Sequence, residues 1–374
     1  MPRKSNKFRF KKNATIGAPA AEEDAFFLEK CFVDTGDLEV LRDCENPKRL
    51  IIGRTGAGKT ALLMRLQETE EHVITVSPFN LSVEFVSNSN VIRFFSELGV
   101  KLDLFYKLLW RHVFTVEILR EKYAIHSRAD QQRFWQSLPD IFKRDKRKKE
   151  ALDYLKKHGE SFFKETEERV KEATRKTESD LRASISGVLP NIDFSVGSAR
   201  KLSDEQKVEV CHRGQEVVNQ VKVRDLNEMF NLLTEGILTD KQQKFYVVID
   251  GLDEHWIDDS IRFHLIRALI DTIREFQKVR TVKIVACLRT DLIERVFRYT
   301  RASGLQEEKM KGLYLHLHWT REELIQLVNQ RVQYLVRDAF TNSEVTCLDI
   351  LPVSKKSPTA FIDYEMPQKP GPPL

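Results

Sequence analysis

The sequence predicts an α/β fold with five strands and a large, mainly helical insertion, and three observations support this prediction. A buried strand that ends at Ile52 leads into a glycine-rich loop and then a helix. A second apolar run, Phe245–Ile249, ends in a group of carboxylates. About 170 residues separate this run from the strand Val73–Val76, far more than one connection in a compact core needs, so an insertion lies between them.

The glycine-rich loop matches the phosphate-binding pattern G-x-x-x-x-G-K-[ST] at every fixed position, and it has the strand-loop-helix context that the motif requires. Backbone N–H groups and a helix start can converge on a triphosphate, and glycines let the backbone come close. We expect Lys59 to lie along the β- and γ-phosphates and Thr60 to bind Mg²⁺. A chance match in a turn is the alternative. The residues expected to contact the nucleotide are Gly53, Arg54, Thr55, Gly56, Ala57, Gly58, Lys59, Thr60 and Ala61.

The second apolar run is typical of a Walker B strand, because it ends in Asp250-Gly251-Leu252-Asp253-Glu254. We expect Asp250 to hold the metal through water, and Asp253 or Glu254 to orient and polarise the attacking water. The sequence does not separate these two carboxylates, although Glu254 is preferred. A buried strand followed by an acidic turn is the structural alternative.

The fourth strand, Val282–Leu288, ends at Arg289. A polar residue at this position lies beside the γ-phosphate in many proteins of this plan, so Arg289 is a candidate sensor; an arginine that anchors the strand end is an equal alternative. A fifth strand is expected at Leu313–Leu317, and a capping box from Thr320 to Glu323 predicts the next helix. Four further arginines are candidates for a role in trans in a homo-oligomer: Arg298, Arg301, Arg321 and Arg331.

The domain prediction follows from these elements. We expect a basic disordered tail at residues 1–20 and a phosphate-loop core in two parts, residues 21–84 and 241–340. We expect a helical insertion at residues 85–240 and an irregular C-terminal tail at residues 341–374. The segment Cys31–Thr35 is expected near the nucleotide base. The basic run Lys143–Lys157 is expected to be the exposed face of a helix, with a phosphate-backbone contact surface as the alternative.

The composition favours a soluble protein in a reducing compartment. Hydrophobic residues make up 41% and charged residues 31%, and the net charge of +5 does not by itself imply nucleic acid. The five cysteines are scattered without a C-x-x-C pair, which argues against a zinc site. No apolar stretch follows the basic start, so we expect no signal peptide. Charges interrupt the apolar stretch Val100–Leu119, which predicts a buried helix, and we expect a cytoplasmic protein with no membrane contact.

This arrangement of motifs resembles the additional-strand P-loop ATPases, a three-layer α/β class whose parallel sheet has the strand order 5-1-4-3-2. The segment Val248–Glu254 is similar to those of the STAND-type, NACHT-like and KAP-like groups, bacterial ATPases of poorly defined function; the AAA+ pattern would have glutamate in place of Gly251. The segments Phe32–Thr35 and Trp319–Leu324 also resemble such a bacterial family.

Two departures from that resemblance concern the nucleotide clamp and the lid. The sequence has no clear Gly-x-Pro after the fifth strand. Relatives continue into a helical lid with a sensor arginine, whereas here Phe361–Tyr364 gives way to a proline-rich end. We therefore expect the lid to be missing, which puts efficient hydrolysis in doubt.

The resemblance implies ATP and Mg²⁺ as ligands and a nucleotide-driven ATPase switch as the function, in the setting of prokaryotic defence or stress. A module that binds nucleic acid or a partner protein through residues 85–240, gated by nucleotide and with negligible hydrolysis, is the alternative. A GTPase is disfavoured because no Asn-Lys-x-Asp motif follows the fourth strand. A nucleotide kinase is disfavoured because no compact acceptor site is apparent.

Overall fold

The structure is a computed structural model of residues 1–374, and it contains two compact units. It describes residues 15–18, 20–78, 90–142, 166–186, 194, 201–216, 232–238, 240–254, 259–300, 307–339 and 345–346. The first unit, which we call the loop unit, comprises residues 1–39, 53–69 and 316–374. The second, which we call the sheet unit, comprises residues 40–52 and 70–315.

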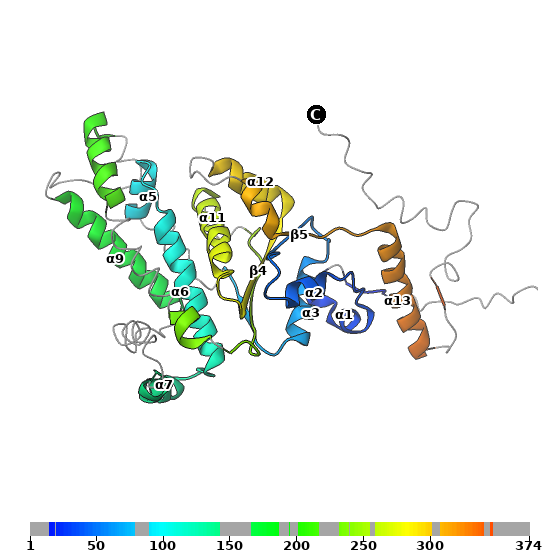
Figure 1. Ribbon diagram of the computed structural model, residues 1–374. Coiled ribbons are helices and arrows are strands. Elements are labelled where there is room, and N and C mark those ends of the chain that lie inside the picture. The colour runs from blue at the N-terminus through cyan, green and yellow to red at the C-terminus, as the bar shows by residue number, and fades with distance from the viewer. Residues whose placement is uncertain are drawn as a thin grey trace, which may run out of the picture. The chain divides into compact units, whose positions relative to one another are not determined.

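The sheet unit is built on a five-stranded parallel sheet with the strand order β2-β3-β4-β1-β5 (Figure 1). Val247 of β3 is paired with Ile74 of β2 on one side and with Ile284 of β4 on the other. The strands are β1 (Leu50–Gly53), β2 (Val73–Val76), β3 (Phe245–Ile249), β4 (Val282–Arg289) and β5 (Tyr314–His316). The predicted α/β class and the expected order of the strands are both confirmed.

The central strands are buried along almost their whole length. Every residue of β3 is buried, and so is every residue of β4 before Arg289. Both strands are apolar runs rather than alternating patterns, as expected for strands of a parallel sheet that is covered on both faces. The exception is Lys283 in β4, whose side chain is fully buried and is satisfied by main-chain carbonyls.

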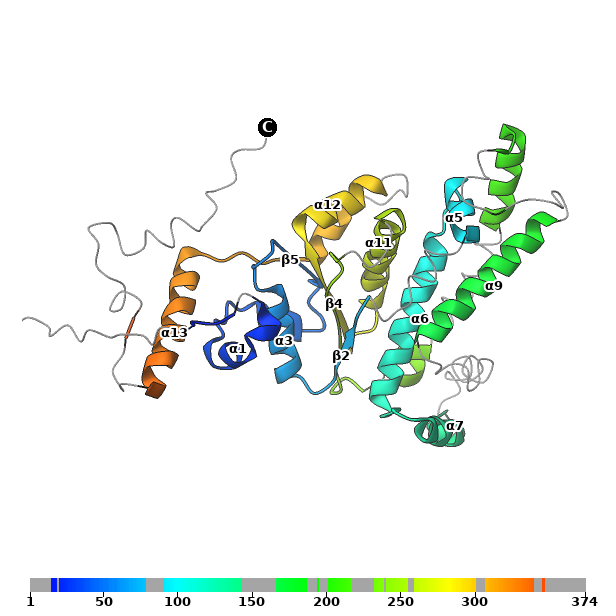
Figure 2. The ribbon, with the colours of Figure 1, turned by 180° about the vertical axis from the view of Figure 1, so that it is seen from behind.

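The described residues between β2 and β3 are mainly helical, as predicted. They form α5 (Asn90–Glu97), α6 (Asp103–Lys122), α7 (Arg128–Phe142), α9 (Thr166–Ser186) and the π-helical segment η6 (Leu232–Ile237). Helix α6 lies alongside α11 (Asp259–Phe276), and α9 packs on α6 (Figures 1 and 2). The apolar stretch that predicted a buried helix is α6, and no helix among the described residues is long and apolar enough to cross a membrane.

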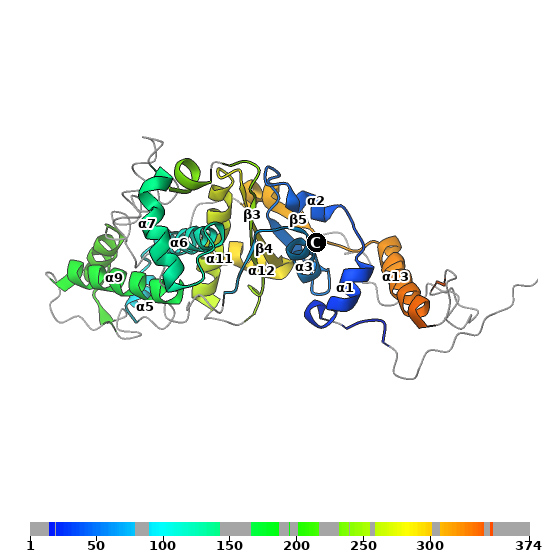
Figure 3. The same cartoon turned by 90° about the horizontal axis from the view of Figure 1, so that it is seen from below.

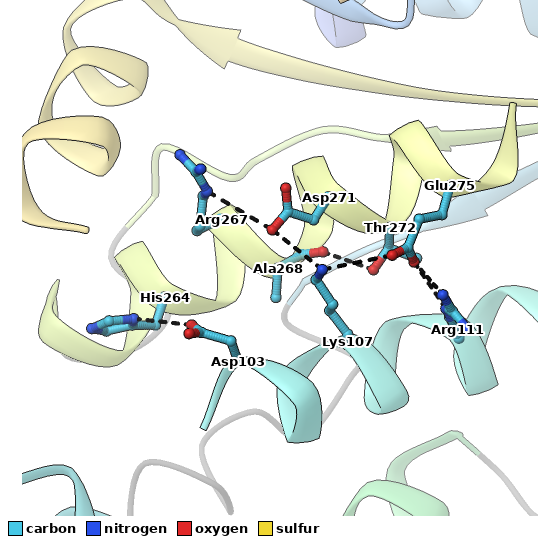
Figure 4. Close-up of polar contacts among 9 residues, drawn as sticks. All are labelled: Asp103, Lys107, Arg111, His264, Arg267, Ala268, Asp271, Thr272 and Glu275. Carbon is cyan, nitrogen blue, oxygen red and sulfur yellow. Dashed lines mark hydrogen bonds and ion pairs between the residues drawn. The ribbon is translucent and has the colours of Figure 1, made fainter. Parts of the chain in front are cut away.

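Charged side chains join α6 to α11 (Figure 4). The ammonium of Lys107 lies 3.5 Å from Asp271 Oδ2 and 3.6 Å from Glu275 Oε1. Arg111 donates to the same Glu275 carboxylate through Nε at 3.0 Å and through Nη2. Trp110 Nε1 also donates to a carbonyl of α11, at 2.9 Å. These contacts hold α6 against α11 within the sheet unit.

The loop unit gathers helices that are far apart in the sequence. Helix α1 (Ala25–Cys31) packs on α3 (Lys59–Thr69) and on α13 (Arg321–Ala339), as Figure 3 shows for α1 and α13. Within this packing, the ring of Tyr334 makes edge contacts with Phe26 and Phe27, and Arg331 pairs with buried Asp24 at 2.5 Å. The region before β1 contains the short helix η1 (Ala21–Glu23), α1 and α2 (Asp37–Arg42).

Several sequence predictions fall on residues outside the described ranges. The basic tail up to residue 14, most of the C-terminal tail, the segment Phe361–Tyr364 and the basic run Lys143–Lys157 all lie there. Of the cysteines, Cys31, Cys44, Cys211 and Cys287 are free thiols in the described part of the chain. The domain boundaries themselves stay a prediction.

Candidate functional site

The predicted phosphate-binding loop, from Gly53 to Thr60, joins β1 to α3 and begins at the carboxyl end of β1. Gly56 and Gly58 have φ of +80° and +88°, a left-handed conformation that other residues adopt at a cost. Gly53 has no room for a side chain, because a Cβ atom there would lie 2.9 Å from the Ala57 Cβ. The three glycines of the motif are thus required by the backbone of the loop, and Arg54–Gly56 at its tip are exposed.

Lys59 is the first residue of α3, and its side chain turns back onto the loop. Its ammonium donates to the carbonyl oxygens of Gly53, at 3.2 Å, and Arg54, at 3.0 Å. These acceptors are neutral and the ammonium is partly exposed, so a phosphate oxygen can compete for the same donors. Thr60 and Ala61 follow in the first turn of α3, where both are half-buried.

The segment that follows β5 lies against the loop within the loop unit. The carbonyl oxygen of Leu317 is 3.1 Å from the position that a Cβ atom would take on Gly53. The Trp319 Cζ2 atom is 3.4 Å from the corresponding position on Gly58. Upstream of the loop, Phe32 of the Cys31–Thr35 segment contacts α3, with the guanidinium carbon of Arg65 5.7 Å from the centre of its ring. Whether Cys31–Thr35 approaches a base stays a prediction.

The carboxylates predicted for metal and water chemistry lie in a tight turn directly after β3, in the sheet unit. The turn is closed by the N–H of Glu254, which donates to the Gly251 carbonyl at 3.2 Å, and Gly251 has φ of +75°. The Asp250 carboxylate accepts the N–H of Gly251 at 2.9 Å. Asp250 is half-buried, whereas Asp253 and Glu254 are exposed, so the last two carboxylates are open to water.

Arg289 stands at the end of β4, where the sheet brings it near the acidic turn. Its Nε is 4.0 Å from Asp253 Oδ2, and its Nε and Nη2 donate to the two carboxylate oxygens of Asp291 at 2.9 and 3.0 Å. Burial alone would raise the pKa of Asp291, but the hydrogen bonds and charge of Arg289 lower it below its usual value. The arginine is therefore held by a carboxylate in this structure.

Arg262, which was not among the predicted site residues, supports the acidic turn. Its side chain is 3% exposed, Nη1 donates to the Glu254 carbonyl at 2.8 Å, and Nη2 pairs with Asp259 at 2.7 Å. A signal was available in the sequence, because Arg262 lies four and seven residues before Ile266 and Leu269 and so shares the buried apolar face of α11 with them. Trp319 was noted for its resemblance to a family segment, and its place beside Gly58 was not foreseen.

The predicted site residues therefore fall into two groups. The loop unit holds the phosphate loop from Gly53 to Ala61, with Lys59 and Thr60, and the sheet unit holds Asp250, Asp253, Glu254 and Arg289. In the part of the chain that the structure describes, no three or more His, Cys, Asp or Glu side chains form a group that could hold a metal ion. Mg²⁺ is usually held by one or two protein oxygen ligands together with water and substrate phosphates, so the side chains of Thr60 and Asp250 fit the chemistry of this ion.

Comparison with known proteins finds one distant similarity. The chain is 21% identical, over 335 residues, to the "Putative transposon gamma-delta 80.3 kDa protein" of Escherichia coli K12. The match covers 86% of this chain and 40% of that protein, so the chain spans less than half the length of its curated relative. No family model matches the chain, and no solved structure matches it.

Proposed function

We propose that this chain binds ATP with Mg²⁺ and acts as a nucleotide-driven switch that hydrolyses the β–γ phosphoanhydride bond. The observation that carries this proposal is the conformation of the loop from Gly53 to Thr60. Left-handed Gly56 and Gly58 and the inward-turned ammonium of Lys59 are what a phosphate-binding loop between a strand and a helix requires.

The roles proposed for the side chains follow from their chemistry. The loop N–H groups and Lys59 bind the phosphates, and Thr60 and Asp250 place the Mg²⁺ ion. Glu254 or Asp253 orients the attacking water, and Arg289 stabilises charge on the γ-phosphate. Catalysis of this kind is mostly positioning and charge stabilisation, which needs no covalent intermediate.

The topology of the sheet supports a shared role for the loop and the acidic turn. The loop follows β1 and the turn follows β3, and both strands belong to one parallel sheet. The carboxyl ends of parallel strands lie along one edge of the sheet, which is where open α/β sheets bind their ligands. We therefore propose that both segments act on the same nucleotide.

Binding of Mg-ATP to the Lys59→Ala variant tests the proposal. Loss of the ammonium removes the cation that the phosphates require, so we expect the affinity measured by titration calorimetry to fall by at least about a hundredfold. Lys30→Ala is the matched control, because Lys30 lies on α1 of the same unit and pairs with exposed Glu29. Equal affinity in the two variants would refute the assignment.

The rate of phosphate release from ATP distinguishes the two carboxylates that are candidates for positioning the attacking water. We expect Glu254→Gln to bind Mg-ATP and to lose phosphate release, while Asp253→Asn keeps most of it. The reverse result would assign the role to Asp253. Full turnover in both variants would exclude either carboxylate from the chemistry.

A second candidate is a nucleotide-gated nucleic-acid binding module with negligible hydrolysis. Arg289 is held by Asp291 in a two-point ion pair, so it must give up a carboxylate before it can contact a phosphate. The similar protein is named for a transposon, which is a DNA element. If this candidate holds, purified protein shifts DNA or RNA in a salt-dependent manner, the shift changes with Mg-ATP, and no phosphate is released.

A further inference from the structure

Trp319 lies against the phosphate loop inside the loop unit. Its Cζ2 atom is 3.4 Å, and its Nε1 atom 3.9 Å, from the position that a Cβ atom would occupy on Gly58. Leu317, two residues earlier, approaches the start of the loop at Gly53 in the same way. The segment that leaves β5 therefore passes beside both ends of the loop.

The fold determines the position of this tryptophan. Strand β5 is the neighbour of β1 in a parallel sheet, so the chain segments that leave the two strands emerge side by side. The next residue, Thr320, caps α13: its N–H donates to Glu323 Oε2 at 2.7 Å, and the Glu323 N–H donates to Thr320 Oγ1 at 3.2 Å. Such a capping box fixes the direction in which the chain enters the helix, and so it holds Trp319 at the loop.

The chemistry of an indole ring suits one part of a nucleotide. Trp319 is half-buried, so part of its surface stays open beside the loop. The loop already supplies N–H donors for phosphates, whereas an indole offers a flat aromatic face on which a base can stack. In the order of strands, β4 and β3 lie on one side of β1, and β5 lies on the other. Trp319 follows β5, so the segment that carries it leaves the sheet beside the loop that follows β1.

We propose that Trp319 stacks on the base of the nucleotide whose phosphates the loop binds, an inference that rests on the function proposed above. Trp319 is then a binding residue that makes the site prefer a nucleoside phosphate to a simple polyphosphate. Because every base has a stacking face, this contact favours nucleotides in general and discriminates little between bases.

A purely structural role for Trp319 makes a different prediction. An apolar residue directly before a helix cap commonly packs on the fourth residue of the helix. Here these two residues are Trp319 and Leu324. Leucine at position 319 would keep this apolar packing and lose the aromatic face. Phenylalanine would keep both. The two variants therefore separate stacking from helix packing.

The experiment is a calorimetric titration of Mg-ADP and of Mg-pyrophosphate into the wild-type chain, Trp319→Leu and Trp319→Phe. Phe26→Leu, an exposed aromatic on α1 of the same unit, is the control. We expect Trp319→Leu to weaken ADP about tenfold and to leave pyrophosphate unchanged. Trp319→Phe should keep ADP affinity to within about threefold, and Phe26→Leu should not change it.

The outcomes distinguish this inference from the proposed function. If the wild-type chain binds both ligands and Trp319→Leu weakens them equally or not at all, stacking is refuted and the phosphate loop assignment survives. If Trp319→Phe loses as much ADP affinity as Trp319→Leu, stacking is also refuted. If the wild-type chain binds neither ligand, the proposed function fails and the inference fails with it.

Discussion

The predicted phosphate loop and the α6–α11 interface place the same charged residue type, lysine, in opposite surroundings. In the loop, the ammonium of Lys59 rests on two neutral carbonyls of its own segment. At the helix interface, Lys107 lies between the carboxylates of Asp271 and Glu275, both supplied by another helix. A lysine on neutral carbonyls can exchange them for a phosphate, whereas a lysine between one buried and one half-buried carboxylate cannot leave them without a cost. The partners and their burial, rather than the residue type, therefore separate a binding charge from a packing charge.

The largest expected effect on stability comes from removing the buried Asp271 carboxylate at the α6–α11 interface. Asp271→Ala leaves Lys107 and the 3% exposed Arg267 without their shared carboxylate, so we expect the free energy of unfolding to fall by about 3–5 kcal/mol. Glu68→Ala, which removes an exposed pair with Arg65 on α3, should cost about 0–1 kcal/mol. Urea denaturation measures both, and equal costs would show that the buried network does not stabilise the fold.

Lys283 resembles Lys59 in that its ammonium donates to main-chain carbonyls, but Lys283 is fully buried. Its ammonium contacts the carbonyls of Val40, Asp43 and Asn46 at 3.0, 2.7 and 2.8 Å. Burial, reinforced by the charge of Arg49, lowers its pKa to about 7 from 10.5 in an unfolded chain. Between these two values the unfolded state binds more protons, so the contribution of Lys283 to stability rises with pH.

The corresponding prediction compares the wild-type chain with Lys283→Met. From pH 7 to pH 10, the stability of the wild type relative to the variant should rise, with a slope that approaches about 1.4 kcal/mol per pH unit. Below pH 7 the difference should level off. Denaturant titrations over this range measure it, and a difference independent of pH would mean that the three carbonyls keep Lys283 charged throughout.

The smallest expected effect concerns two capping boxes. The Ser203 hydroxyl accepts the Gln206 N–H at 3.3 Å at the start of the helix over residues 204–216. Thr320→Ala and Ser203→Ala each remove a helix cap, so each should cost about 1 kcal/mol of stability. Thr320 is the cap next to Trp319, whereas Ser203 caps a different helix. We therefore expect Thr320→Ala, and not Ser203→Ala, to weaken Mg-ADP binding several-fold as well. Calorimetry on the two variants tests this difference, and a similar loss of affinity in both would remove the link between the cap and the loop.

Local sequence patterns predicted much of this fold. Three patterns predicted local backbone structure from a few neighbouring residues, and the structure has each predicted feature. They are the glycines at 53, 56 and 58, the apolar strand before Asp250 and the capping box at Thr320. The order of the strands came from resemblance and is confirmed.

The partners of charged residues could not be predicted in the same way, because they join distant segments. Lys107 and Arg111 were noted only as charges that interrupt an apolar helix, and their partners lie more than 150 residues away in the sequence. The same holds for Trp319, whose contact with Gly58 depends on β5 lying next to β1. Nothing within a few residues of these side chains specifies such a contact.

We propose that the predicted phosphate loop and Asp250 bind one nucleotide, and the Mg²⁺ dependence of ATP affinity in the Asp250→Asn variant measures this. The wild-type chain should bind ATP at least about tenfold more tightly with Mg²⁺ than with EDTA, because the metal joins the phosphates to the carboxylate. Asp250→Asn should bind ATP without Mg²⁺ as the wild type does and should lose most of the gain. If the variant keeps the full gain, Asp250 does not hold the metal and the claim is wrong.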